Sequence, residues 1–155
     1  MPPCPLSAKS PLTIALDLEG TLISNAMSCF PRPGLKGFLD HCRNEADRVV
    51  LFTAVFEERV RPILAMLTGE GSAPAWFRDI EIVRWEGIVK DLRFIPGADV
   101  PLTLLVDDLK EYVHPEQESQ WVPIENYAAP YSADDRALDD VAREITRRFA
   151  PYKTA

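Results

Sequence analysis

Three apolar runs of strand length constrain the fold of this chain more than any other feature of its sequence. They lie at residues 12–18, 48–53 and 101–106, and each is almost continuously apolar. Runs of this kind are typical of strands buried on both faces, as in a parallel sheet. We therefore expect three central strands in a sheet that is covered on both sides.

The segments between and after these runs predict the remaining elements. Residues 79–85 alternate between apolar and polar side chains, and residues 121–125 contain Pro123, which is typical of an edge strand. Apolar residues at helical spacing predict three helices, over residues 34–42, 55–67 and 133–149. Strands that alternate with helices predict an α/β fold with a central, mostly parallel sheet flanked by helices.

Length and composition limit the class of protein. The chain has 155 residues, which suits one domain, and its net charge of −7 argues against a sequence-independent nucleic-acid binder. No apolar run reaches bilayer length, and the three cysteines lack CxxC spacing, which predicts a reducing compartment. We expect a flexible leader over residues 1–11, one domain over residues 12–150, a cytoplasmic location, and neither nucleic acid nor membrane as a partner. The oligomeric state is left open.

Polar side chains follow the three central runs. Asp17 lies at the end of the first run, Thr53 ends the second, and Asp107 and Asp108 follow the third. Since the carboxyl ends of parallel strands meet at one edge of a sheet, where ligands bind, we expect these side chains to lie close together.

Such a group suits the hydrolysis of phosphate esters. Asp17 at a rigid strand end is a candidate nucleophile that would carry a covalent phosphoryl group. Asp107 and Asp108 supply the hard oxygen ligands that Mg²⁺ prefers. Lys90 adds positive charge, and Thr53 offers a hydroxyl donor to a phosphate oxygen.

The turn after Asp17 offers further candidates. Glu19 could protonate the leaving alcohol and later deprotonate the attacking water. The backbone amides around Gly20 and Thr21 are candidates for holding phosphate oxygens. Taken singly, each of these residues also fits a structural role, such as a turn, a cap or a solvated charge. Their order and placement together favour the catalytic interpretation. We expect Arg32 and Arg93 to be solvated surface charges, although either could contact substrate.

The order Asp17, Glu19, Thr21, Thr53, Lys90 and Asp107–Asp108 resembles the four motifs of the haloacid dehalogenase superfamily. More narrowly, the chain resembles the C-terminal-domain phosphatases, also called the NLI-interacting-factor family. The resemblance is carried by IALDLEGTLI at 14–23, PRPGLKGFL at 31–39, VVLFTA at 49–54, IVKDL at 88–92, LLVDDLKEYVHPE at 104–116 and WVPIENY at 121–127.

This resemblance implies a Rossmann-like fold without a separate cap domain, and a role for each matching residue. Asp17 matches the phosphorylated nucleophile, Glu19 the general acid and base, Thr53 the phosphate-binding hydroxyl and Lys90 the neutralising lysine. The implied magnesium site consists of Asp17, the backbone carbonyl of Glu19, and the pair Asp107 and Asp108. Asp108 ranks ahead of Asp107, since it occupies the position of an Asn ligand in many relatives. Glu19 departs from the family, which usually has Asp there.

We therefore predict a Mg²⁺-dependent phosphomonoester hydrolase that forms an aspartyl-phosphate on Asp17. An open site without a cap would admit a phosphoprotein carrying phosphoserine, phosphothreonine or phosphotyrosine. Two alternatives stay open: a catalytically silent binding module with the same fold, and a phosphatase of small metabolites or nucleotides.

Overall fold

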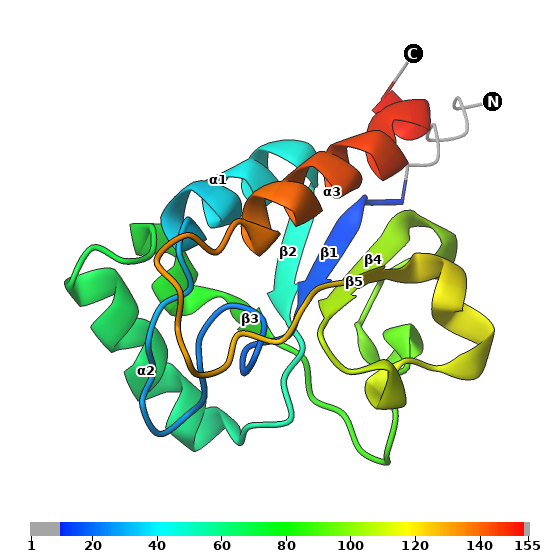
Figure 1. The fold of residues 1–155 in the computed structure, drawn as a ribbon. Coiled ribbons are helices and arrows are strands. Elements are labelled where there is room, and N and C mark those ends of the chain that lie inside the picture. Colours follow the sequence, from blue (N-terminus) through cyan, green and yellow to red (C-terminus); the bar gives the residue numbers. More distant parts are fainter. Residues whose placement is uncertain (1–9, 154–155) are drawn as a thin grey trace, which may run out of the picture.

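The computed structural model describes residues 10–153, which form a five-stranded parallel sheet with helices packed against it (Figure 1). The strands are β1 (Thr13–Leu16), β2 (Arg48–Leu51), β3 (Glu81–Ile82), β4 (Thr103–Asp107) and β5 (Trp121–Pro123). Their order in the sheet is β3-β2-β1-β4-β5. The α-helices are α1 (Leu35–Glu45), α2 (Glu57–Gly69) and α3 (Ala137–Lys153). The predicted α/β fold is confirmed, and β5 with its proline is an edge strand.

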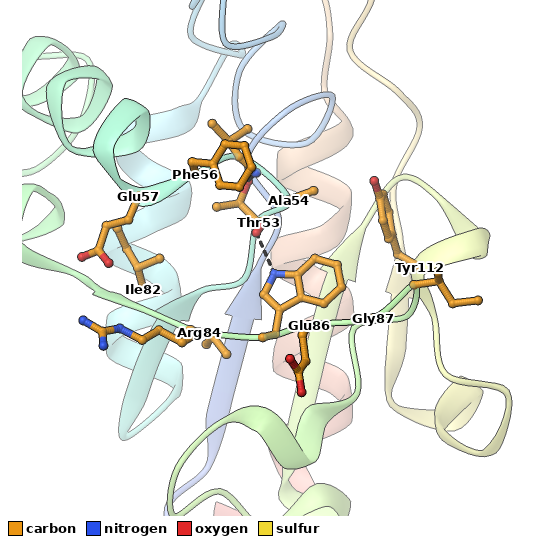
Figure 2. Close-up of a pocket in the computed structure, with 13 residues that line it drawn as sticks. Thr53, Ala54, Phe56, Glu57, Ile82, Arg84, Glu86, Gly87 and Tyr112 are labelled. Atoms are coloured by element: carbon orange, nitrogen blue, oxygen red, sulfur yellow. Dashed lines mark hydrogen bonds between the residues drawn. The ribbon is translucent and has the colours of Figure 1, made fainter.

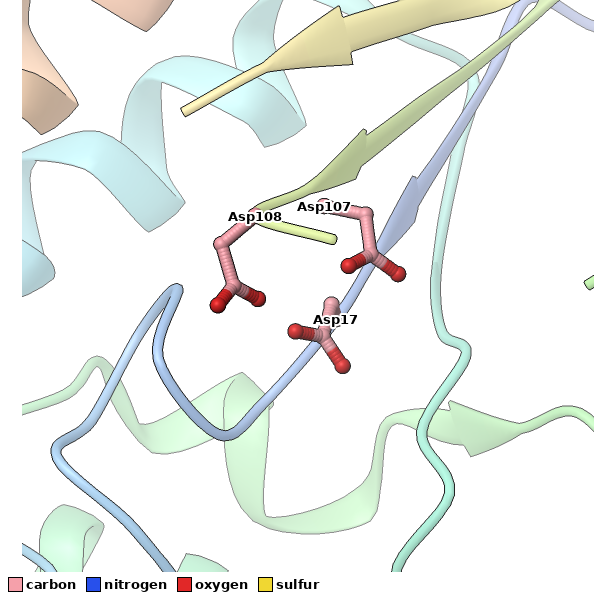
Figure 3. Close-up of side chains that lie close together, drawn as sticks. All are labelled: Asp17, Asp107 and Asp108. Atoms are coloured by element: carbon pink, nitrogen blue, oxygen red, sulfur yellow. The ribbon is translucent and has the colours of Figure 1, made fainter. Parts of the chain in front are cut away.

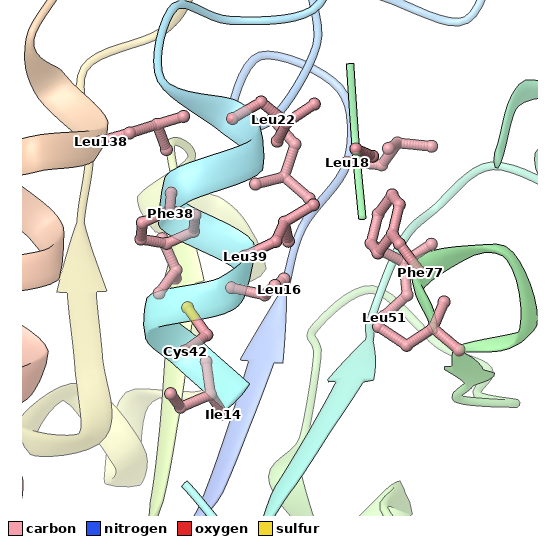
Figure 4. Close-up of a cluster of buried hydrophobic side chains, with 14 of the residues drawn as sticks. Ile14, Leu16, Leu18, Leu22, Phe38, Leu39, Cys42, Leu51, Phe77 and Leu138 are labelled. Atoms are coloured by element: carbon pink, nitrogen blue, oxygen red, sulfur yellow. The ribbon is translucent and has the colours of Figure 1, made fainter. Parts of the chain in front are cut away.

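One face of the sheet is covered by the three α-helices. Ile14 and Leu16 of β1 belong to a buried apolar cluster to which all three helices contribute. Figure 4 shows Phe38, Leu39 and Cys42 of α1 lying over β1 in this cluster. Burying one such stripe stabilises a helix that would be marginal alone in water.

The opposite face is covered by short 3-10 helices. Ala15 and Val50 turn to this side and pack in a second buried cluster with Leu92, Ile95 and Val113. The covering segments include Leu92–Phe94, Val100–Leu102 and Lys110–Tyr112. Both faces of the sheet are therefore buried, as the continuous apolar runs predict.

The register of the sheet brings the carboxyl ends of its central strands to one level. Leu16 of β1 pairs with Leu51 of β2 on one side and with Val106 of β4 on the other. The Asp17 N–H donates to the Val106 carbonyl at 3.0 Å. Asp17 and Asp107, the residues that follow Leu16 and Val106, consequently lie side by side at the carboxyl edge of the sheet.

The segment 79–85 differs from the predicted strand. A 3-10 helix occupies Ala75–Asp79, and only Glu81–Ile82 pair with β2. The paired strand ends at Ile82, although the Val83 N–H still donates to the Leu51 carbonyl at 2.9 Å. Beyond it, the Trp85 indole N–H donates to the Thr53 carbonyl at 2.8 Å, just past the end of β2.

The predicted leader lies largely outside the described residues, which begin at residue 10. Among the described residues, no helix has the length and apolar character needed to cross a membrane.

Candidate active site

Three carboxylates meet at the carboxyl edge of β1 and β4 (Figure 3). One oxygen from each of Asp17, Asp107 and Asp108 lies within 4.8 Å of the other two. Lys90, which is completely buried, donates from its Nζ to Asp17 Oδ1 at 2.8 Å and to Asp107 Oδ2 at 2.6 Å. The structure thus brings together four residues that the sequence places in three separate segments.

The two aspartates after β4 have different surroundings. Asp107 is buried, and its second oxygen accepts the N–H of Leu109 at 2.9 Å. Asp108 is half-buried, and its Oδ1 lies 3.3 Å from the Thr21 hydroxyl, which also lies 2.9 Å from Asp17 Oδ2. Asp107 therefore has both oxygens engaged by the protein, whereas Asp108 keeps more of its carboxylate for another ligand.

The site holds three carboxyl groups and one ammonium group, that of Lys90. Burial raises the pKa of Asp17 to about 6, against the opposing effect of Lys90. Burial also raises the pKa values of Asp107 and Asp108. Burial acts to lower the pKa of Lys90, but the charges of Asp17 and Asp107 outweigh it and raise that pKa. Three acids with raised pKa values around one ammonium group form a donor set that a divalent cation would complement.

Gly20 allows the loop after β1 to approach the site closely. Its φ is 74°, a left-handed conformation that favours glycine. A Cβ at this position would lie 2.5 Å from Asp108 Oδ2 and 2.5 Å from Asn126 Oδ1. Sequence analysis did not single out Asn126, which lies three residues after the end of β5, next to β4 in the sheet. Its place beyond a neighbouring strand was the available signal.

The other predicted residues lie around this centre. Glu19 does not join the three carboxylates; its Oε2 accepts the Ala26 N–H at 2.7 Å. The Thr53 hydroxyl accepts the Val55 N–H at 3.1 Å, and its own hydrogen has no acceptor within residues 10–153, so it can donate to a ligand.

The turn amides bond within their own loop. The Gly20 N–H donates to the Ile23 carbonyl at 2.8 Å, and the Thr21 N–H to the Leu18 carbonyl at 3.4 Å. Contact of these amides with phosphate stays a prediction.

Residues 12–153 match the family of the NLI interacting factor-like phosphatases. The chain belongs to this family. This family is a branch of the haloacid dehalogenase superfamily, as the sequence motifs predict. A search of curated proteins finds no match.

Arg32 supports the loop after β1 in this member of the NLI interacting factor-like phosphatases, a role that sequence analysis missed. It is 2% exposed, so the prediction of a solvated surface charge is wrong. Its guanidinium donates to both oxygens of Asp135, at 3.0 and 3.1 Å, and lies over the Tyr127 ring. Nη1 lies 3.3 Å from the carbonyls of Gly20 and Thr21. These partners satisfy the buried charge and hold the loop after β1. Arg93 is exposed, as predicted.

A pocket of about 580 Å³ opens beside Thr53 (Figure 2). The segments after β2 and after β3 form most of its wall, and Tyr112 closes one side. Three aromatic side chains line it: Phe56, Trp85 and Tyr112. The volume lies in the range of small-ligand sites, and the phosphate-binding candidate Thr53 belongs to the lining.

Proposed function

We propose that this protein hydrolyses phosphate monoesters in a Mg²⁺-dependent reaction in which Asp17 is the nucleophile. The observation that carries this proposal is the buried Lys90, which bridges Asp17 and Asp107 beside Asp108. A bridge of this kind is what a carboxylate needs if it is to approach an anionic phosphate. Membership in a family of phosphatases supports the same reaction.

The donor set fits Mg²⁺. The ion prefers oxygen ligands, and the three aspartates supply one oxygen each within a small volume. Asp17 and Asp108 are the proposed side-chain ligands, with the backbone carbonyl of Glu19 and a contribution from Asp107. When bound, the ion would neutralise the negative charge that accumulates as the carboxylate and the phosphate approach each other.

The reaction then follows from the residues of the chain. An oxygen of Asp17 attacks phosphorus, a new oxygen–phosphorus bond forms, and the bond to the leaving oxygen breaks. Glu19 gives its proton to that oxygen, so an alcohol leaves. A water molecule then attacks the aspartyl-phosphate and Glu19 takes its proton, which releases inorganic phosphate and restores Asp17. This role requires the Glu19 carboxylate to leave the Ala26 N–H that it accepts.

Lys90 and Thr53 position the phosphate in this scheme. The ammonium group of Lys90 offsets the charges of Asp17 and Asp107 and keeps the nucleophile oriented. The free hydrogen of the Thr53 hydroxyl would bind a phosphate oxygen. The proposed substrate is a phosphorylated protein. The proposed location is the cytoplasm, which the free thiols of Cys29 and Cys42, the two cysteines among the described residues, support.

The test is turnover of a generic aryl phosphate with and without Mg²⁺, for the wild type, Asp17→Asn and Asp79→Asn. Asp79 is exposed at the end of a 3-10 helix and serves as a control for the same substitution away from the site. We expect Mg²⁺-dependent turnover that disappears in Asp17→Asn and persists in Asp79→Asn. Full turnover by Asp17→Asn would refute the mechanism. A well-folded but inactive wild type would instead favour the silent binding module.

A further inference from the structure

We propose that the pocket beside Thr53 binds the aromatic ring of a phosphotyrosyl residue, with Trp85 as the specificity-determining side chain. The inference rests on the proposed function, because the phosphate is taken to bind at Asp17. It adds a substrate class: an aromatic ring esterified directly to the phosphate.

Thr53 joins the pocket to the phosphate site. Its hydroxyl is free to donate toward the phosphate, while its carbonyl accepts the Trp85 indole N–H at 2.8 Å (Figure 2). The phosphate-binding group and the wall of the pocket are thus parts of a single residue and its hydrogen-bond partner. A ring attached to the phosphate oxygen could contact Trp85 directly, whereas serine or threonine carries no ring to place there.

Tyr112 makes a second connection. The Lys90 Nζ lies 4.8 Å from the centre of the Tyr112 ring, and the Lys90 N–H donates to the Tyr112 carbonyl at 2.6 Å. Tyr112 also packs edge-to-face with Trp85, with ring centres 6.1 Å apart. The pocket therefore adjoins the catalytic group at two points, and its occupant is expected to belong to the same substrate molecule.

The walls are suited to a flat apolar group. Trp85 is fixed by its hydrogen bond and by edge-to-face packing on Phe52 at 5.5 Å. At the mouth, Phe56 is 82% exposed and Ile88 is 85% exposed. Exposed large apolar side chains next to a rigid aromatic wall favour an aromatic partner, which prefers edge-to-face or offset contacts.

The charge of the lining favours a neutral ring over a nucleotide with several phosphates. Glu57 and Glu86 contribute two negative charges, and Arg84 contributes one positive charge. Additional phosphate groups would meet a net negative wall, whereas the tyrosyl ring brings no charge of its own.

The experiment compares the binding of phenylphosphonate and methylphosphonate by calorimetry in the presence of Mg²⁺. Neither compound has a leaving group, so reactivity does not influence the result. Proteins to be compared are the wild type, Trp85→Ala, Phe56→Ala and the control Trp76→Ala. Trp76 is matched to Trp85, since it is also half-buried, packs edge-to-face on Phe77 and donates its indole N–H once, to Asp40 at 3.2 Å.

We expect the wild type to bind phenylphosphonate about tenfold more tightly than methylphosphonate. The ratio of the two dissociation constants should fall toward one in Trp85→Ala, decrease in Phe56→Ala and stay unchanged in Trp76→Ala. Using the ratio cancels any general loss of phosphate affinity caused by the broken bond to Thr53. Phe56→Ala alters only an exposed side chain, so the test survives if Trp85→Ala does not fold.

A wild-type ratio near one, or a ratio unchanged in both Trp85→Ala and Phe56→Ala, would overturn the inference.

Matched phosphotyrosine and phosphoserine peptides give the second readout. In Trp85→Ala, kcat/KM should fall about tenfold more for the phosphotyrosine peptide than for the phosphoserine peptide. An equal fall for both peptides would count against the assignment. Selective phenylphosphonate binding without turnover would support the pocket and contradict the proposed function. Turnover with a binding ratio near one would support the proposed function and contradict the assignment of the pocket.

Discussion

Replacing Gly20 by alanine tests how the loop after β1 approaches the carboxylates. The φ of 74° at this position is strained for a residue with a side chain. In addition, the new Cβ would lie only 2.5 Å from Asp108 Oδ2 and 2.5 Å from Asn126 Oδ1. Both atoms are ends of short side chains that can rotate. We therefore expect the protein to fold with Asp108 displaced from its position beside Asp17.

Two other glycines separate these effects. Gly71 has a φ of 80°, and a Cβ added there would have no atom within 4 Å, so Gly71→Ala measures the backbone strain alone. Gly37 lies inside α1 with equally open space and no left-handed φ, so Gly37→Ala should stabilise by about 0.5–1 kcal/mol. Gly71→Ala should cost about 1–2 kcal/mol. Gly20→Ala should cost that amount plus about 1 kcal/mol for moving two polar side chains.

The assays are urea unfolding for stability, and Mg²⁺ titration with aryl phosphate turnover for the site. Gly20→Ala should lose Mg²⁺ affinity and turnover at temperatures where it remains folded, while Gly71→Ala and Gly37→Ala keep both. If Gly20→Ala were as active as Gly71→Ala, the close approach to Asp108 would have no functional importance and the reasoning would fail.

Two further predictions concern the buried ion pair. Arg32→Met should destabilise the fold by about 3 kcal/mol in urea unfolding, because it leaves Asp135 without its partner. Arg48→Met breaks the more exposed pair with Glu81 and should cost about 1 kcal/mol or less. Equal losses of stability in the two variants would contradict this prediction. Burial acts to raise the pKa of Asp135, but its hydrogen bonds to Arg32 outweigh this and hold the pKa below the ordinary value of 3.8. Ionised Asp135 therefore stabilises the fold fully above that value and less as pH falls through the lowered pKa, so the stability difference between wild type and Asp135→Asn should shrink from about pH 5 to about pH 2; a difference independent of pH would refute this.

The parts of the structure that the sequence predicts are those with a strong local pattern. The runs at 12–18, 48–53 and 101–106 are apolar because their strands are buried on both faces, and topology then brings Asp17 and Asp107 to one edge. The expectation that parallel strands end at one edge brought these two residues together, and the register of β1 with β4 sets them side by side.

The missed features depend on partners that no local pattern identifies. The charge of Arg32 is buried only because Asp135, 103 residues further along, meets it. Trp85 lies in a segment whose alternation resembles a strand, yet the paired strand ends at Ile82 and the Trp85 indole donates to the Thr53 carbonyl instead of packing as a strand residue would. The 3-10 helices over the second face are too short to show a helical period.

The Asp135 carboxylate also accepts the N–H of Ala137, the first residue of α3, at 3.0 Å, while it binds the Arg32 guanidinium that contacts the loop after β1. One side chain thereby links an early segment of the chain to a late one. During synthesis on the ribosome, β1 emerges long before this partner exists. We expect the loop that carries the proposed nucleophile to reach its final conformation only after residue 137 has left the exit tunnel, so the timing of translation would decide when the site first forms.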